Sequence, residues 1–131
     1  MNINIGFAIA AGLSGLAVIA HAAGGVRGRA GPLMASSLPP AAKWLLWTSL
    51  HMVTLINLTL TLCFWWAAVN FQGRAAASAL TAFALAASLL GLVAALRGRL
   101  GWSGLGLAML YALIFVAGAW GCYGSFLDGA G

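Results

Sequence analysis

Acidic residues are almost missing from this sequence. Asp128 is the one acidic residue among 131, and it lies beyond the last long apolar stretch. Carboxylates carry much of the proton transfer, metal binding and ion coupling that takes place inside membranes. A chain that lacks them there is not expected to be an enzyme or to bind a metal through acidic ligands. We therefore assign no catalytic residues and no metal ligands.

Charged residues as a whole are also scarce. They make up 5% of the chain, hydrophobic residues make up 63%, and the mean hydropathy is +1.04, whereas a soluble domain has about 25% charged residues. A membrane span needs about 20 apolar residues, and four stretches qualify: residues 3–23, 44–69, 75–96 and 102–121. The sequence predicts an all-α polytopic membrane protein with a single transmembrane domain, residues 1–131, folded as a compact four-helix bundle.

Glycine and proline indicate where these helices end. Gly24 and Gly25 are expected to stop the first helix, and Pro39-Pro40 to begin the second, because proline suits a first turn. Residues 24–43 would then form the one sizeable loop. The glycine-rich tail, residues 123–131, is expected to be loose unless something holds it.

The basic residues predict the orientation. With four spans, five of the six lie on one side of the membrane and Arg74 lies on the side of both termini. By the positive-inside rule the five face the cytoplasm, so both termini face outward, to the periplasm in a Gram-negative bacterium. The expected location is a bacterial inner (cytoplasmic) membrane. The five residues are Arg27, Arg29, Lys43, Arg97 and Arg99.

These basic groups are expected to contact lipid phosphates, at about 1 kcal/mol each near an anionic leaflet. They form no stripe, so nucleic-acid binding is not expected. The pair Arg27 and Arg29 has an alternative interpretation, in which it grips one specific lipid head group or an acidic face of a partner protein.

A cleaved signal peptide is the weaker interpretation of the first segment. Ala20-His21-Ala22 resembles a signal-peptidase site, but the residues before the apolar run carry no positive side chain.

The second segment carries a polar stripe. At 100° per residue its members fall within about 140° of arc, and the opposite side carries Leu46, Leu50, Val53 and Leu60. We interpret the stripe as interhelical hydrogen bonding, worth about 0.6 kcal/mol per bond; the alternative is a lining for a pigment, quinone, haem or lipid. Its members are Trp44, Trp47, His51, Thr54, Asn57, Thr61 and Trp65.

His21 and His51 are the candidate cofactor ligands, with Asn57 and Trp47 as further cofactor-binding residues. Two imidazoles can ligate a haem iron, and one can ligate a chlorophyll magnesium or another metal. His51 would lie about 10 Å below the membrane surface and His21 within about 5 Å of it, an offset that disfavours a shared iron. Histidines that only pack and form hydrogen bonds are the favoured interpretation.

Two further sets of residues bear on packing. Cys63 and Cys122 are expected to be reduced thiols rather than a disulfide, because Cys63 lies deeper. Small residues recur four apart in the other three segments, which lets helices approach closely. The sequence leaves open whether every row is used within the chain or some face another subunit, but three such helices leave a surplus for docking. The rows are Gly6 and Ala10, Ala11 and Gly15, Ala87, Gly91 and Ala95, and Gly104, Ala108 and Ala112.

About the first 55 residues loosely resemble small, uncharacterised four-helix bacterial membrane proteins that pair an H…GG…PL…LP loop with an H-x-V-T second helix. This resemblance implies a fold and a role for the two histidines, and no activity. Proton-coupled small multidrug transporters resemble the chain poorly, because they need a glutamate that the first segment lacks. The matching residues are His21, Gly24-Gly25, Pro32-Leu33, Leu38-Pro39, Lys43, Trp47 and His51-Met52-Val53-Thr54.

Two function classes remain. The favoured one is an accessory or structural subunit of a larger respiratory or photosynthetic membrane complex, which packs on other subunits and contacts lipid, pigment or quinone. The alternative is a stand-alone membrane protein that binds haem or another small molecule through His21 and His51.

Overall fold

A computed structural model describes residues 3–98 and 101–129, with the backbone alone at residues 25–27, 101–104, 128 and 129. The described part is almost entirely helical. Four of its helical stretches are long and apolar enough to cross a membrane: Ile5–Ala35, Pro40–Val69, Phe71–Gly98 and Leu105–Leu127. The expectation of an all-α chain with four candidate spans is therefore confirmed.

The helices follow one another with short connections. The elements are α1 (Ile5–Ala20), the π-helical η1 (His21–Val26), α2 (Arg27–Ala35), α3 (Pro40–Val69), the 3-10 turn η2 (Phe71–Gly73), α4 (Arg74–Gly98) and α5 (Gly101–Gly129). Pro40 is the first residue of α3, as the sequence predicted, because a first-turn residue needs no N–H partner within its helix.

The loop expected at residues 24–43 is wrong as secondary structure. The helix does not stop at Gly24 and Gly25 but passes through them as η1 and continues to Ala35. Glycine costs a helix only about 1 kcal/mol relative to alanine, whereas breaking the helix near the membrane would leave several backbone groups without partners. The connection that remains is residues 36–39.

The tail, expected to be loose unless something holds it, is held and helical over residues 123–129. Helix α5 continues through Ser125 to Gly129. The amide of Asn4 holds this end, since its Nδ2 donates to the Gly121 carbonyl oxygen at 2.9 Å and lies 3.2 Å from the Ser125 hydroxyl. The same side chain caps α1, because its Oδ1 accepts from the Phe7 N–H at 3.1 Å.

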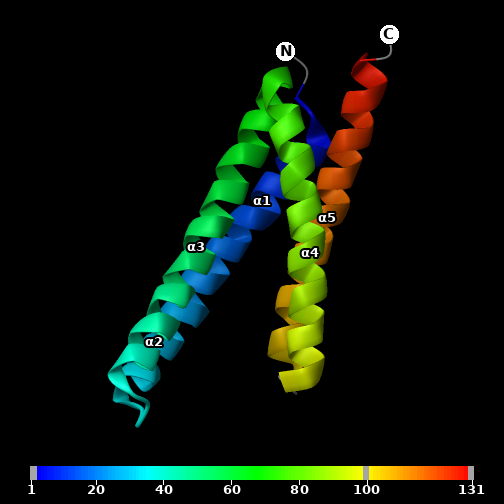
Figure 1. The fold of residues 1–131 in the computed structure, drawn as a ribbon. Coiled ribbons are helices and arrows are strands. Elements are labelled where there is room, and N and C mark those ends of the chain that lie inside the picture. Colours follow the sequence, from blue (N-terminus) through cyan, green and yellow to red (C-terminus); the bar gives the residue numbers. More distant parts are fainter. Residues whose placement is uncertain (1–2, 99–100, 130–131) are drawn as a thin grey trace.

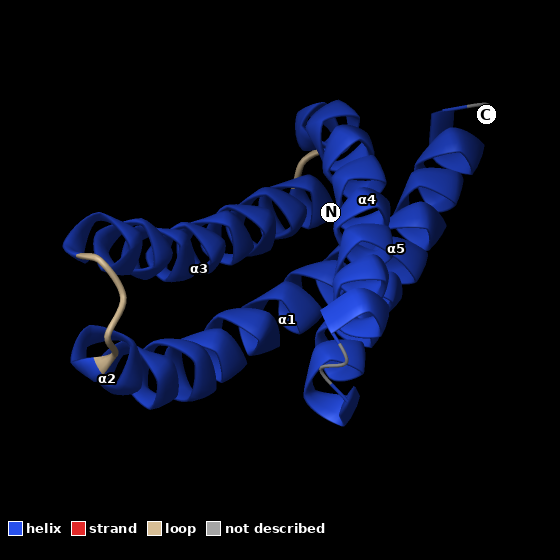
Figure 2. Ribbon diagram, turned by 60° about the horizontal axis from the view of Figure 1, so that its bottom comes forward, coloured by secondary structure: helices blue, strands red, loops and turns tan. Residues whose placement is uncertain are grey.

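The helices form two hairpins that meet as a V (Figure 1). One arm is α1 and α2 lying beside α3, and the other is α4 beside α5, as the turned view in Figure 2 also shows. Both termini lie at the end where the arms meet, which we call the closed end. The arms separate toward the opposite end, the open end, so the expected compact bundle is compact at one end only.

The buried core lies at and just below the closed end. Phe7 of α1 and Phe64 of α3 are fully buried and their rings stack with centroids 6.1 Å apart. Ile114 of α5 is also fully buried and extends this core into the second arm. Of the helix pairs that join the arms, α1 and α5 have the most extensive contact and form the main joint.

Glycine makes that joint close. A Cβ added at Gly6 would overlap the backbone of Gly121, and one added at Gly121 would overlap the ring of Phe7. Only residues without a side chain allow two helix backbones to approach to this degree. The row that begins with Gly6 and Ala10 is thus used within the chain.

Candidate functional site

The two histidines lie on the same arm but face different neighbours. Nε2 of His21 donates to the Leu50 carbonyl oxygen of α3 at 2.9 Å. The ring of His51 instead packs edge-on against Trp47, with centroids 4.0 Å apart. No interaction described by the structure joins the two imidazoles, so they are not brought together as a ligand pair.

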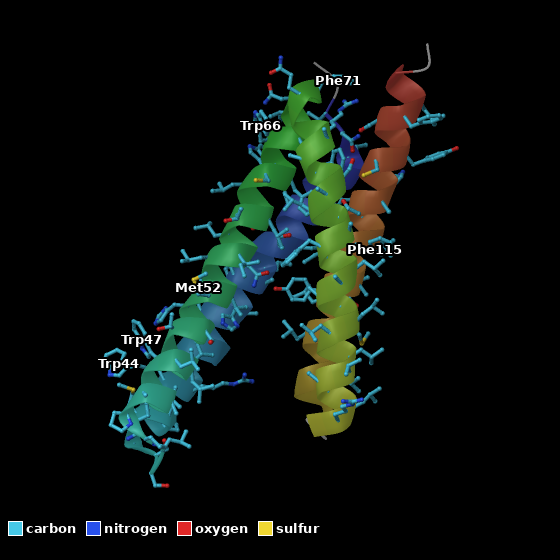
Figure 3. All side chains as sticks on the ribbon, in the orientation of Figure 1. Trp44, Trp47, Met52, Trp66, Phe71 and Phe115 are labelled. Carbon is cyan, nitrogen blue, oxygen red and sulfur yellow. The ribbon has the colours of Figure 1, made fainter. Side chains whose placement is uncertain are left out.

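Trp47 does not line a site between the arms. Figure 3 shows Trp44 and Trp47 on the side of α3 that faces away from α4 and α5. The two indoles contact each other, with centroids 5.6 Å apart. At this level of α3 the tryptophans thus face the surroundings of the protein rather than its interior.

The polar stripe of α3 is not a uniform interior face. Of its members only Asn57 is fully buried, and Trp44 and Trp65 are each more than half exposed. Leu60, which the periodicity placed on the opposite side, is 1% exposed. The face that packs on other helices is rotated toward Leu60 and Phe64, and Phe7 of α1 stacks on Phe64 from that side.

The threonines of the stripe bond within their own helix. The Thr54 hydroxyl donates to the Leu50 carbonyl oxygen at 3.3 Å and that of Thr61 to the Asn57 carbonyl oxygen at 2.9 Å. A hydroxyl satisfied by the preceding turn has little left to offer a neighbouring helix. For the described stripe, interhelical bonding is therefore concentrated at Asn57.

Asn57 forms a polar bridge between the arms. Its Oδ1 accepts from the Tyr111 hydroxyl of α5 at 2.8 Å, and both residues are buried. The Nδ2 of Asn57 is buried and has no hydrogen-bond partner. Sequence reasoning did not single out Tyr111, although a tyrosine in the middle of an apolar span requires a partner for its hydroxyl.

The predicted basic group divides into separate roles. Lys43 donates from Nζ to the Met34 carbonyl oxygen at 2.9 Å and so satisfies the end of α2. Arg97 lies exposed in the last turn of α4. Arg99 and the side chain of Arg27 lie outside the described residues. On the other side, Arg74 lies over the Phe71 ring at 4.9 Å.

Arg29 lies with His21 in a cleft between the arms at the open end. The cleft consists of two adjoining cavities of about 360 and 400 Å³ that share His21, Arg29 and Leu107. This size is in the range of small-molecule sites. Apart from these three its walls are mostly apolar: Ala17, Ala20, Gly24, Leu33, Leu46, Ser49, Leu50, Val53, Gly106 and Leu110.

The π-helical segment helps to place both polar residues on this cleft. In an unbroken α-helix, residues eight apart, such as His21 and Arg29, differ by about 80° around the axis. A π turn contains more residues and so rotates the chain less per residue. Since η1 lies between the two, it reduces their angular separation. Such an insertion cannot be read from hydrophobic periodicity.

A third cavity, of about 350 Å³, lies on a separate apolar groove between α3 and α4. Its lining includes one polar side chain, Thr59, whose hydroxyl is bonded to the Leu55 carbonyl oxygen at 3.0 Å. The groove therefore offers contact with a hydrocarbon chain and no recognition of a polar group. The cleft that holds His21 and Arg29 is the candidate functional site.

The small-residue rows and the cysteines serve the packing of the chain itself. A Cβ added at Gly91 of α4 would lie 3.5 Å from the backbone of Ala108 of α5, and one added at Gly15 would lie 3.7 Å from Thr61 of α3. Cys122 lies 3.3 Å from the Ser78 hydroxyl, and both cysteines are free. The rows are thus used within the chain at Gly15 and Gly91.

The site has few donors for a metal or a pigment. Within the described residues, no three His, Cys, Asp or Glu side chains come together. The N–H at Nε2 of His21 is hydrogen-bonded to the Leu50 carbonyl oxygen, so the imidazole has only Nδ1 left to act as a ligand. The site can therefore offer a positive charge, one imidazole nitrogen and apolar walls.

Known proteins offer no guide to this arrangement. No protein-family model, curated protein or solved structure matches the chain. The resemblance of the first 55 residues to four-helix bacterial membrane proteins stays a hypothesis.

Proposed function

We propose that this chain is an integral membrane protein that holds an amphiphilic small molecule in the cleft between its two hairpins. One observation carries the proposal: the arms part at the open end, and the space between them has mostly apolar walls and three polar side chains, His21 and Arg29 on both cavities and Ser49 on one. A site with apolar walls and a few polar groups that orient the guest is typical of ligand binding. No residue is assigned a catalytic role.

The proposed orientation puts the open end on the cytoplasmic side of a bacterial inner membrane. The described residues at that end include Arg29, Lys43 and Arg97, whereas Arg74 lies near the closed end. The positive-inside rule supports this arrangement. The termini, which lie together at the closed end in Figure 1, would then face outward.

Filling the cleft tests the proposal. Leu107 lines both cavities, so Leu107→Trp would occupy the space between the arms. Leu113 of α5 is 54% exposed and lines neither cavity, so Leu113→Trp is the matched control. After purification in mild detergent, solvent extracts of the wild type and of Leu113→Trp should contain one retained amphiphile per chain, and extracts of Leu107→Trp should lack it.

The same extracts identify what kind of molecule is retained. Mass spectrometry distinguishes a lipid from a quinone, and an absorption spectrum reveals haem or chlorophyll. Equal retention by all three proteins, or none by the wild type, would exclude the proposed site.

An accessory subunit of a larger membrane complex is the second candidate. The observation that favours it is the exposure of the span that contains α4. Of its 18 most apolar consecutive residues 17% are buried, against 28% or more in each of the other spans. Exposed large side chains on this helix include Leu89, Leu90 and Leu96. Co-purification of larger membrane proteins in mild detergent would support this role, and recovery of a stable, isolated chain would count against it.

A further inference from the structure

Arg29 is the feature of the cleft that a neutral guest does not explain. It lines both cavities together with Leu107 of the other arm. A guanidinium stays protonated in proteins, so a positive charge faces the space between the arms. Placing a charged arginine side chain in a membrane costs free energy unless an anion or water compensates the charge.

The chain has no carboxylate side chain that can reach this charge. Its single acidic residue is Asp128. On α5 this position lies 21 residues beyond Leu107, or about 30 Å along the helix axis, toward the closed end. Arg29 is also exposed, so its guanidinium is open to an anion from outside the protein.

The depth of Arg29 suits a lipid head group. Leu107 is six residues from the start of α5 at Gly101, which corresponds to about 9 Å. The 29 residues of α5 span about 43 Å, about 13 Å more than a hydrocarbon core of about 30 Å, so a centred α5 extends about 7 Å beyond the core at each end. The guanidinium beside Leu107 thus lies near the boundary between hydrocarbon and head groups.

The walls around Arg29 suit a hydrocarbon chain. Leu33, Leu46, Leu50 and Val53 form one side, and Leu107 with Leu110 forms the other. His21 is held against the Leu50 carbonyl by its Nε2, so its other nitrogen remains for a polar group of the guest. Charge at the rim and apolar walls along the cleft are complementary to one kind of molecule.

We infer that the cleft binds an acidic amphiphile, a molecule with one anionic head group on Arg29 and a hydrocarbon chain between the arms. This inference rests on the proposed function and specifies its ligand class. The head group can be a phosphate, as in an acidic phospholipid, or a carboxylate, as in a fatty acid. Arginine binds both through paired N–H donors.

Titration of the purified protein in detergent, followed by native mass spectrometry, tests the inference. Three probes are compared: phosphatidylglycerol, oleate and the uncharged diacylglycerol. We expect one or both acidic probes to bind the wild type at least about tenfold more tightly than diacylglycerol. Preference for phosphatidylglycerol alone identifies a phosphate ligand, and preference for oleate alone identifies a carboxylate.

The matched variants are Arg29→Gln and Arg97→Gln, since Arg97 is exposed on α4 outside the cleft. Arg29→Gln should abolish the tenfold preference for acidic probes while diacylglycerol binding is kept. Arg97→Gln should keep the preference, and Arg29→Lys should restore part of it because the charge returns without the paired donors. Circular dichroism checks that each variant is folded.

The outcomes separate this inference from the proposed function. Equal binding of all three probes by the wild type would overturn the acidic ligand and leave an occupied cleft. Equal losses in Arg29→Gln and Arg97→Gln would also overturn it, because they would indicate surface charge rather than a site. Absence of binding by every probe, together with no effect of Leu107→Trp on retained molecules, would overturn both.

Discussion

The two ends of the V use glycine for opposite purposes. At the closed end Gly6 and Gly121 let α1 touch α5, and an added Cβ at either position would overlap its neighbours. At the open end a Cβ added at Gly24, Gly28, Gly31 or Gly106 would meet nothing within 4 Å. Glycine content therefore does not by itself indicate close packing. Whether a glycine matters depends on which backbone faces it.

The difference extends to the larger side chains. Rings and small residues interlock at the closed end, where Phe7 and Phe64 are fully buried. At the open end leucines and Arg29 line a cavity instead of filling it. We infer that the closed end supplies most of the stability and the open end is free to take a guest.

The largest expected effect is at Gly6. Gly6→Ala places a Cβ against the Gly121 backbone, so α1 and α5 must move apart at their main joint. Overpacking of this kind costs about 2 to 3 kcal/mol. The free energy of unfolding, followed by circular dichroism during titration with sodium dodecyl sulfate, should fall by this amount.

Gly12→Ala is the control on the same helix, since nothing lies within 4 Å of its added Cβ. It should leave the free energy of unfolding unchanged or raise it by up to about 1 kcal/mol, because alanine favours helix. Similar losses in both variants would show that the contact of α1 with α5 is not the main joint.

The second effect concerns the bridge between the arms. Tyr111→Phe removes the hydrogen bond to Oδ1 of the buried Asn57 amide, whose Nδ2 has no partner among the described residues. Leaving a buried polar group without a partner costs about 1 to 3 kcal/mol. The free energy of unfolding should fall accordingly.

Adding Asn57→Leu to Tyr111→Phe should recover part of that loss, because two apolar side chains leave no buried amide to satisfy. A double-mutant cycle measures the coupling between the two positions. If the double variant is less stable than Tyr111→Phe alone, Asn57 does not depend on Tyr111 for its polar partner, and the bridge between the two residues is contradicted.

A smaller effect is expected at Lys43. Lys43→Met removes the bond from Nζ to the Met34 carbonyl oxygen at the end of α2. The loss is about 0.5 kcal/mol and local, because the lysine acts on the last turn of a helix. Hydrogen exchange of the α2 amides should accelerate while global unfolding stays the same; a large drop in global stability would mean that the open end supports the whole fold.

No loss of stability is expected at Gly28 in α2. Gly28→Ala meets no atom within 4 Å and gains helix propensity of up to about 1 kcal/mol. The free energy of unfolding should stay the same or rise slightly, in contrast to Gly6→Ala. A substantial loss would show that the open end is closely packed around α2.

The candidate site was only partly accessible from the sequence. The sequence singled out His21 as a candidate cofactor ligand and Arg29 as a contact for a lipid head group. It did not predict that the two lie in the same site. The π-helical segment and the path of α5 bring them to one cleft. The polar stripe of α3 does not form a site. Periodicity shows which residues share a face of one helix, whereas their burial depends on the side from which α1 covers α3.

Composition and length alone identified four stretches that could cross a membrane. A stretch that crosses a membrane must satisfy its own backbone hydrogen bonds, which makes a helix the outcome, and the structure has four such helices among its described residues. The sequence also placed the start of α3 at Pro40, since proline has no N–H to lose there.

Tertiary structure decided where the helices touch. Residues more than a hundred positions apart, such as Gly6 and Gly121, fix the joint, and no local pattern encodes their meeting. The same joint sets the divergence of the arms and thereby the cleft around Arg29. Helix formation depends on local backbone bonding, whereas packing depends on the shapes of surfaces that only the fold brings together.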